Sequence, residues 1–171
     1  MVTIRKASEK DIAVIQEIVQ QTWPVTYGEI LSQDQISYML KLMYSSEKLT
    51  SQLNNGHDFY IAEENGEYFG FAGIELHYNA HNMLRLHKIY VLPSAQGKSV
   101  GLSLIKKIVD VGLAENQENI NLNVNRYNKA KTFYEKLGFE VVKEENIDIG
   151  NGYLMEDFVM EVKMENLKVE I

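Results

Sequence analysis

The chain has 171 residues, a length typical of one domain with its own core, and the composition of an ordinary globular protein. Its formal net charge of −7 argues against nucleic acid as a partner, because phosphate backbones require basic patches, but it is compatible with a cationic substrate. The absence of cysteine excludes disulfides, a thiol nucleophile and cysteine-ligated metal. With no apolar run of membrane-spanning length and no signal peptide, we expect one cytoplasmic domain over residues 1–171 and no membrane partner.

The N-terminal third reads as a short strand followed by three helices. The strand covers residues 2–5, and the first helix starts at a capping pattern of Ser8 with Asp11 and runs to about Thr22, where Trp23-Pro24 is expected to break it. Two further helices are expected, one after Ser32 and one capped by Ser45 or Ser46 that ends at Gly56.

The middle of the chain predicts a hairpin, a loop and a long strand. Residues 58–63 and 67–76 are expected to pair as the two strands around Glu64-Asn65-Gly66, a sequence typical of a tight turn. A polar loop at 78–82 follows, and then an apolar strand over 84–92 that Pro93 closes. Beyond Gly101, apolar residues recur at helical spacing, which predicts a helix.

The last third predicts a strand at 120–125, a short helix capped by Gly138, and two strands at 139–148 and 158–169 joined through a turn at Gly150-Asn151-Gly152. The element order implies an α/β (α+β) fold. We expect a single mixed, mostly antiparallel twisted sheet of about seven strands with helices on both faces and one parallel pair.

The turn at residues 96–101 joins a strand to a helix, so its backbone N–H groups and the helix dipole form a natural phosphate cradle. Gly97-Lys98-Ser99 is not a Walker loop, since that motif needs a glycine at position 92, which is leucine. Two interpretations of the segment remain: a plain strand–turn–helix without a ligand, and a loop that binds the pyrophosphate of coenzyme A. The segment resembles the cofactor loop of the GNAT superfamily of N-acetyltransferases, Q/R-x-x-G-x-G/A, in which Gln96 and Gly101 match the first and last places. Ser99 replaces the usual middle glycine, and we expect its backbone to avoid positive φ.

A second segment carries the same resemblance. Members of the superfamily often contain N-x-A-x-x-x-Y-x-K-x-G-F, and the run from Asn128 to Phe139 matches it, with Tyr134 in the tyrosine position. The two motifs occur in the family's order, separated by one helix and one strand. The resemblance implies a GNAT-like fold in which two parallel strands splay apart around the pantetheine arm of acetyl-CoA.

The resemblance also implies roles for individual residues. Backbone groups of Ile89, Tyr90 and Val91 would bind the pantetheine and polarise the thioester carbonyl. N–H groups of the turn would hold the pyrophosphate, Asn128 would contact the pantetheine arm, and Tyr134 would protonate the departing thiolate. The residues expected at the cofactor are therefore Ile89, Tyr90, Val91, Gln96, Gly97, Lys98, Ser99, Val100, Gly101, Asn128 and Lys131.

Several of these residues also have plainer interpretations. Tyr134 lies on the apolar face of its helix and could be a core tyrosine, Asn128 could be an N-cap, and Lys98 and Lys131 could be solvated lysines. For the general base we name Glu75, at the end of a strand, with His87 as the other candidate, and either could equally be structural. His77-x-x-x-His81 has metal-ligand spacing, but it lies in a loop without a third ligand, so we expect no metal.

We therefore expect an N-acetyltransferase that moves an acetyl group from acetyl-CoA to a primary amine of a small molecule by direct attack on the thioester. A polyamine is one candidate acceptor, and Trp23, Tyr27, Met39, Met43 and Tyr44 are either lining for an amine pocket or core residues. Peptide or protein N-terminal acetylation and a non-catalytic acyl-CoA-binding module are the alternatives. The sequence does not decide whether the chain forms a homodimer.

Overall fold

The computed structural model describes residues 1–169. Its strands and helices, in chain order, are β1 (Thr3–Lys6), α1 (Ile12–Tyr27), α2 (Gln33–Tyr44), α3 (Ser46–Asn54), β2 (His57–Glu64), β3 (Glu67–Glu75), β4 (Met83–Val91), α4 (Val100–Ala114), β5 (Asn119–Asn125), α5 (Ala130–Lys136), β6 (Glu140–Gly150) and β7 (Tyr153–Lys163). None of the helices in this part of the chain is both long enough and apolar enough to span a membrane.

The strands form one open, mixed sheet of seven strands, as the sequence predicted, and their order is β1-β2-β3-β4-β5-β7-β6. The described residues divide into two compact units, one of residues 1–75 and 87–108 and the other of residues 76–86 and 109–169. Strand β4 contributes its second half to the first unit and its first half to the second unit.

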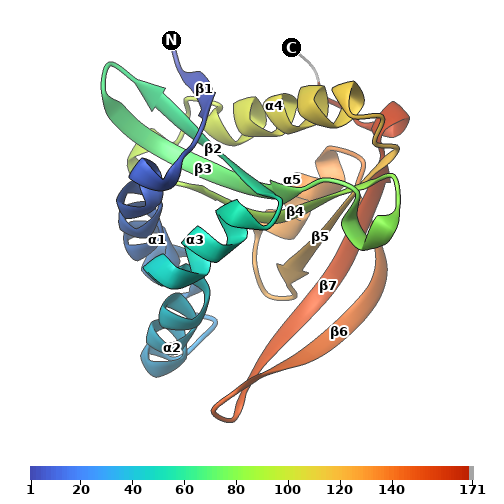
Figure 1. Cartoon of the computed structure of the whole chain (residues 1–171). Coiled ribbons are helices and arrows are strands. Elements are labelled where there is room, and N and C mark those ends of the chain that lie inside the picture. Colours follow the sequence, from blue (N-terminus) through green and yellow to red (C-terminus); the bar gives the residue numbers. More distant parts are fainter. Residues whose placement is uncertain (170–171) are drawn as a thin grey trace. The chain divides into compact units, whose positions relative to one another are not determined.

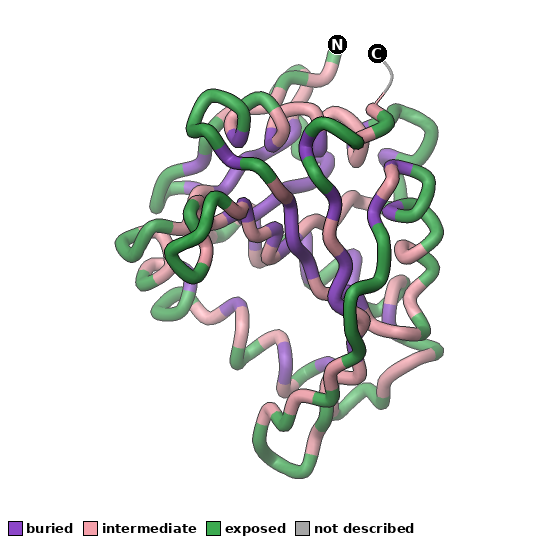
Figure 2. Tube along the Cα trace, turned by 90° about the vertical axis from the view of Figure 1, so that its right-hand side faces the viewer, coloured by how far each residue is buried: buried purple, intermediate pink, exposed green. Residues whose placement is uncertain are grey.

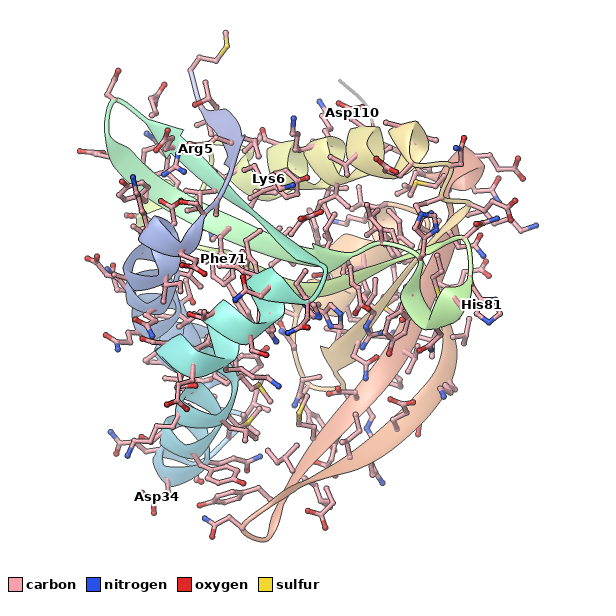
Figure 3. The ribbon with its side chains drawn as sticks, viewed as in Figure 1. Arg5, Lys6, Asp34, Phe71, His81 and Asp110 are labelled. Carbon is pink, nitrogen blue, oxygen red and sulfur yellow. The ribbon has the colours of Figure 1, made fainter. Side chains whose placement is uncertain are left out.

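In the first unit, the three N-terminal helices pack together, and α1 and α3 also pack against the β2–β3 hairpin (Figure 1). The middle of β2 and most of β3 are buried, and Phe59 and Phe71 stack with their ring centroids 6.4 Å apart. Figure 3 labels Phe71 within this core. The predicted hairpin is confirmed, with Asn65 and Gly66 both at positive φ in the turn.

Two of the predicted helix starts are confirmed in atomic detail. The hydroxyl of Ser32 accepts a hydrogen bond from the N–H of Gln35, and the hydroxyl of Ser45 accepts one from the N–H of Lys48. Each bond satisfies a backbone donor that the first turn of a helix leaves free.

The expected break of α1 at Trp23-Pro24 is wrong, because the helix continues to Tyr27 with Pro24 inside it. Proline disfavours this position, since it lacks an N–H and crowds the preceding turn. The rings of Trp23 and Tyr27, one helical turn apart with centroids separated by 4.8 Å, are both buried. The free energy gained by burying these two aromatic side chains offsets the loss of the hydrogen bond that proline removes.

In the second unit, β5 pairs with β7, and β7 pairs with β6, antiparallel in both cases. The last strand begins at Tyr153 and ends at Lys163, not at the predicted Phe158 and Val169. Strand β7 begins immediately after the turn, because Gly150, Asn151 and Gly152 all adopt positive φ and reverse the chain. Gly150 then pairs directly with Tyr153. Strand β6 is mainly exposed, so this edge of the sheet carries much less of the core than the buried strands that Figure 2 colours purple.

The parallel pair is β4 with β5. Its register runs from Met83 opposite Asn119 to Leu86 opposite Leu122. Arg85 holds this pair together through its guanidinium, which donates hydrogen bonds to the side-chain oxygens of Asn121 and Asn123.

Candidate active site

The turn between β4 and α4 is exposed from Gln96 to Ser99, and α4 begins at Val100. Gly97 has φ of +84° and Ser99 has φ of +56°. The expectation that Ser99 avoids positive φ is therefore wrong. The serine occupies the left-handed conformation that the usual glycine would adopt at lower energy, which is the physical reason for glycine at this place in the motif.

The same turn leaves a row of backbone donors unused. In the described part of the chain, the N–H groups of Gly97, Ser99, Val100, Gly101 and Leu102 make no hydrogen bond. They adjoin the positive end of the dipole of α4, a fifteen-residue helix. An anionic group such as a pyrophosphate would satisfy several of these donors at once.

Lys98 lies within this turn, and its side chain already has contacts. Its Nζ is 3.9 Å from a carboxylate oxygen of Glu64 and 4.6 Å from the ring centroid of Phe69. Gln96, the first residue of the motif, is exposed.

Ile89, Tyr90 and Val91 form the end of β4, and Tyr90 is anchored at two points. Its hydroxyl lies 2.9 Å from that of Tyr27, and its carbonyl oxygen lies close to Gly70 of β3, where an added Cβ would come within 2.6 Å. The absence of a side chain at Gly70 thus allows β3 to approach the backbone of β4 closely.

Glu75 and His87, the two candidates for the base, lie together. Nε2 of His87 is 3.0 Å from Oε1 of Glu75, and Nε2 of His57 is 3.4 Å from the same oxygen. The two imidazole rings stack with centroids 4.5 Å apart. Burial lowers the pKa of His57, an effect that the nearby Glu75 carboxylate partly opposes.

Sequence reasoning missed His57, and the reason is a β-bulge. From the turn, Glu64 pairs with Glu67, so an uninterrupted hairpin would place His57 opposite Ile74. The register shifts by one residue between Ala62 and Glu63, which places His57 opposite Glu75. A bulge leaves no reliable trace in one sequence, so the pattern of residues could not reveal this contact.

The second motif lies in the other unit. The Oδ1 atom of Asn128 accepts a hydrogen bond from the N–H of Ala130, the first residue of α5, at 2.9 Å, although the N-cap residue of that helix is Lys129. Lys131 pairs with Glu135 at 3.4 Å and lies over the ring of Phe158. Tyr134 is 6% exposed, and its ring packs edge-on against that of Phe139.

Most of the residues weighed as pocket lining belong to the core of the first unit, and only Met43 of the five is not fully buried. Trp23, Tyr27, Met39 and Tyr44 are buried, and the rings of Trp23 and Tyr44 meet edge-on at 5.8 Å. An open hollow of about 230 Å³ lies nearby and includes Tyr44 among its lining residues. The others that line it are Gln16, Val19, Gln20, Leu40, Lys41 and Ser45.

Strand β4 also carries a buried lysine that the sequence did not reveal. Lys88 is 9% exposed, and its Nζ donates a hydrogen bond to Gln52 at 2.8 Å and lies 5.3 Å from the ring centroid of Tyr44. Burial, with a smaller contribution from the nearby positive charge of Lys48, lowers the pKa of Lys88 to about 8.

Comparison with known proteins identifies the family. The chain is 27% identical to a spermidine N(1)-acetyltransferase of Thermoplasma acidophilum over 96% of this chain and 99% of that protein. It is 30% identical to the uncharacterized N-acetyltransferase YuaI of Bacillus subtilis over 91% of this chain and 90% of the relative. Its fold matches a crystal structure of the PaiA N-acetyltransferase of T. acidophilum in complex with coenzyme A, with a TM-score of 0.81 at 27% identity over 95% of this chain and 99% of that one. The family model of the acetyltransferase (GNAT) domain matches residues 29–161 of the sequence. The chain is therefore a GNAT-family acyltransferase.

Proposed function

We propose that this enzyme transfers the acetyl group of acetyl-CoA to a primary amine of a small molecule, with a polyamine such as spermidine as the acceptor. The observation that carries the proposal is the row of unused N–H donors at the start of α4, at the place where the family motif binds its cofactor. The likeness to a named spermidine acetyltransferase over nearly the whole chain supports the choice of acceptor. The net charge of −7 is compatible with a polycation.

In the proposed reaction the amine nitrogen attacks the carbonyl carbon of the thioester directly. A thioester is already activated, so the enzyme mainly has to align the two reactants. Backbone groups of Ile89, Tyr90 and Val91 would bind the pantetheine and stabilise negative charge on the carbonyl oxygen. The carbon–sulfur bond then breaks, and the sulfur leaves as the coenzyme A thiolate.

Three proton transfers complete the proposed reaction. The acceptor ammonium must lose a proton before it can attack, and we assign this step to Glu75, whose carboxylate contacts His87. Tyr134 would give a proton to the thiolate, and the second proton that the attacking nitrogen loses as it becomes an amide would restore the tyrosine. The reaction needs no metal ion, since neither the attack nor the departure of the thiolate requires a Lewis acid.

The cofactor part of the proposal is tested by Gly101→Glu. The new carboxylate would repel the pyrophosphate and fill space at the start of α4, so calorimetry should register a loss of acetyl-CoA binding. A variant that folds, by its circular dichroism spectrum, and keeps its affinity would show that the cofactor binds elsewhere.

The acceptor part is tested by a panel of amines. Release of free thiol from acetyl-CoA should be fastest with spermidine and spermine, slower with monoamines, and negligible with peptides that have a free N-terminus. Preference for the peptides would favour N-terminal acetylation. Cofactor binding without thiol release for any acceptor would favour a non-catalytic acyl-CoA-binding module.

A further inference from the structure

Three strands of the first unit bring two imidazoles and a carboxylate to one point. His57 begins β2, Glu75 ends β3, and His87 lies on β4. One ligand-capable atom from each residue lies within 4.8 Å of the others. The acetyl-transfer chemistry proposed above uses Glu75 and leaves His57 without a role.

The distances from the carboxylate oxygen of Glu75 to the two imidazole nitrogens suit a cation site. Zinc bonds of about 2.0 to 2.2 Å to nitrogen and oxygen place neighbouring ligands of a tetrahedron roughly 3.4 Å apart. The two distances to Oε1 of Glu75 are 3.0 Å from His87 and 3.4 Å from His57. Because the rings of His57 and His87 stack with centroids 4.5 Å apart, at least one of them would have to rotate for both Nε2 atoms to point at one ion.

The chemistry and accessibility of the three groups agree with this geometry. Imidazole nitrogens with a carboxylate oxygen are ligands typical of zinc, and three protein ligands leave a fourth position for water. The side chains of His57, Glu75 and His87 are 16%, 31% and 23% exposed, so an ion could reach them from solvent. In the described part of the chain, Nδ1 of His57 is buried without a partner, and Nε2 is the ring nitrogen that faces the cluster.

We propose that Nε2 of His57, Oε1 of Glu75 and Nε2 of His87 bind one divalent transition-metal ion, with Zn²⁺ as the best fit. The ion would coordinate the Glu75 carboxylate, the same group that is assigned to accept the proton from the amine. Metal binding and acetyl transfer would therefore exclude each other, and this consequence alone rests on the proposed function. Zinc would act as an inhibitor and not as part of the reaction.

The four histidines of the chain offer a matched control. His77 and His81 have the sequence spacing of a metal pair, but His77 bonds Gln117 through Nδ1 at 3.0 Å, and His81 is exposed on the loop after β3 (Figure 3). The proposed site therefore requires that the affinity for the metal ion depends on His57 and His87 and is independent of His77 and His81.

The test is direct titration of the full chain, without an affinity tag, after removal of metal with a chelator. Co²⁺ serves as a spectroscopic probe and Zn²⁺ is followed by calorimetry, both in the absence of acetyl-CoA and amine. We expect one Zn²⁺ per chain and the visible absorption of four-coordinate Co²⁺. His57→Ala and His87→Ala should each weaken Zn²⁺ binding by about 10-fold or more, equivalent to about 1.4 kcal/mol, whereas His77→Ala and His81→Ala should not change it.

His57→Gln and Glu75→Gln, checked by circular dichroism, provide further variants if an alanine variant does not fold. Absence of Zn²⁺ binding to the wild type would overturn the site, as would binding that survives in the His57 and His87 variants or that depends on His77 and His81. Because the titration contains no substrate, its outcome is separate from that of the acetylation assay. Zinc binding by a chain that acetylates no amine would retain the metal site and reject the proposed function.

Discussion

Nε2 of His87 lies 3.0 Å from Oε1 of Glu75, so neighbouring strands hold a carboxylate and an imidazole in hydrogen-bond contact. This contact is the basis for assigning the removal of the amine proton to Glu75. The carboxylate would accept the proton, and His87 would hold it in position.

Glu75→Gln should therefore lower kcat/KM for the amine by about 10²-fold, the lower end for general base catalysis. The amide keeps the size of the side chain but cannot accept the proton. Because a more alkaline solution supplies more neutral amine, the loss should shrink as pH rises. Rates from pH 6 to 10 for the wild type, Glu75→Gln and the control His81→Ala would measure this, and a uniform loss at all pH values would contradict the role as base.

Ser99→Gly should stabilise the protein, because φ of +56° suits glycine better than serine. We expect a gain in the free energy of unfolding of about 0.5 to 1 kcal/mol, reduced by the greater chain entropy of glycine in the unfolded state. Denaturant unfolding measures it. Ser94→Gly is the matched control, since Ser94 is also exposed but does not have positive φ, and it should be neutral or destabilising. A loss of stability in Ser99→Gly would show that the serine side chain contributes more than the backbone conformation costs.

Tyr134→Phe should retain stability and acetyl-CoA affinity but lose transfer rate. The ring and its packing against Phe139 remain, while the hydroxyl is removed. The leaving thiolate is only moderately basic, since a thiol has a pKa near 8.5, so we expect a fall of about 10²-fold in kcat with little change in KM for acetyl-CoA.

Single-turnover kinetics should be used for Tyr134→Phe, because slow product release would hide a change in the chemical step. Tyr127→Phe is the control, since Tyr127 is exposed and lies before the helix that carries Tyr134. An undiminished single-turnover rate in Tyr134→Phe would leave Tyr134 as a core residue.

Lys88→Met should raise stability at neutral pH. Burial lowers the pKa of Lys88 from 10.5 to about 8, so the charged form is less favourable in the folded than in the unfolded chain. The unfolded state then binds more protons between about pH 8 and 10.5, and the contribution of Lys88 to stability rises with pH across that range. The shift corresponds to about 3 kcal/mol at most, and we expect a gain of about 1 to 3 kcal/mol from the substitution at pH 7.

The measurement for Lys88→Met is denaturant unfolding at pH 7 and at pH 10. The difference between the variant and the wild type should be smaller at pH 10, where the wild-type lysine is neutral in the folded state. A variant less stable than the wild type at pH 7 would mean that the hydrogen bond to Gln52 outweighs the cost of burying the charge.

The sequence predicted those features that depend on neighbouring residues. The caps at Ser32 and Ser45 and the turn at Asn65-Gly66 follow from local backbone chemistry, and the structure confirms them. The order of elements was sufficient for the mixed sheet and its parallel pair, because parallel strands need an intervening helix.

Features that depend on contacts between residues far apart in the chain could not be predicted from the sequence. The continuation of α1 through Pro24 follows from the burial of Trp23 and Tyr27, which no local pattern states. The pairing of His57 with Glu75 depends on a bulge, and the positive φ of Ser99 opposes the preference of serine. The roles of the cofactor residues and of Tyr134 remain predictions.

The most direct test of the account is to follow the acetyl group itself. Acetyl-CoA carrying an isotopic label in its acetyl group should be incubated with the enzyme and spermidine, and the products should be separated and weighed by mass spectrometry. We predict that the label appears on a nitrogen of spermidine in the same molar amount as the free coenzyme A released, and that neither product forms without the amine. Coenzyme A release that does not depend on spermidine, or unlabelled spermidine after complete reaction, would contradict the proposed transfer.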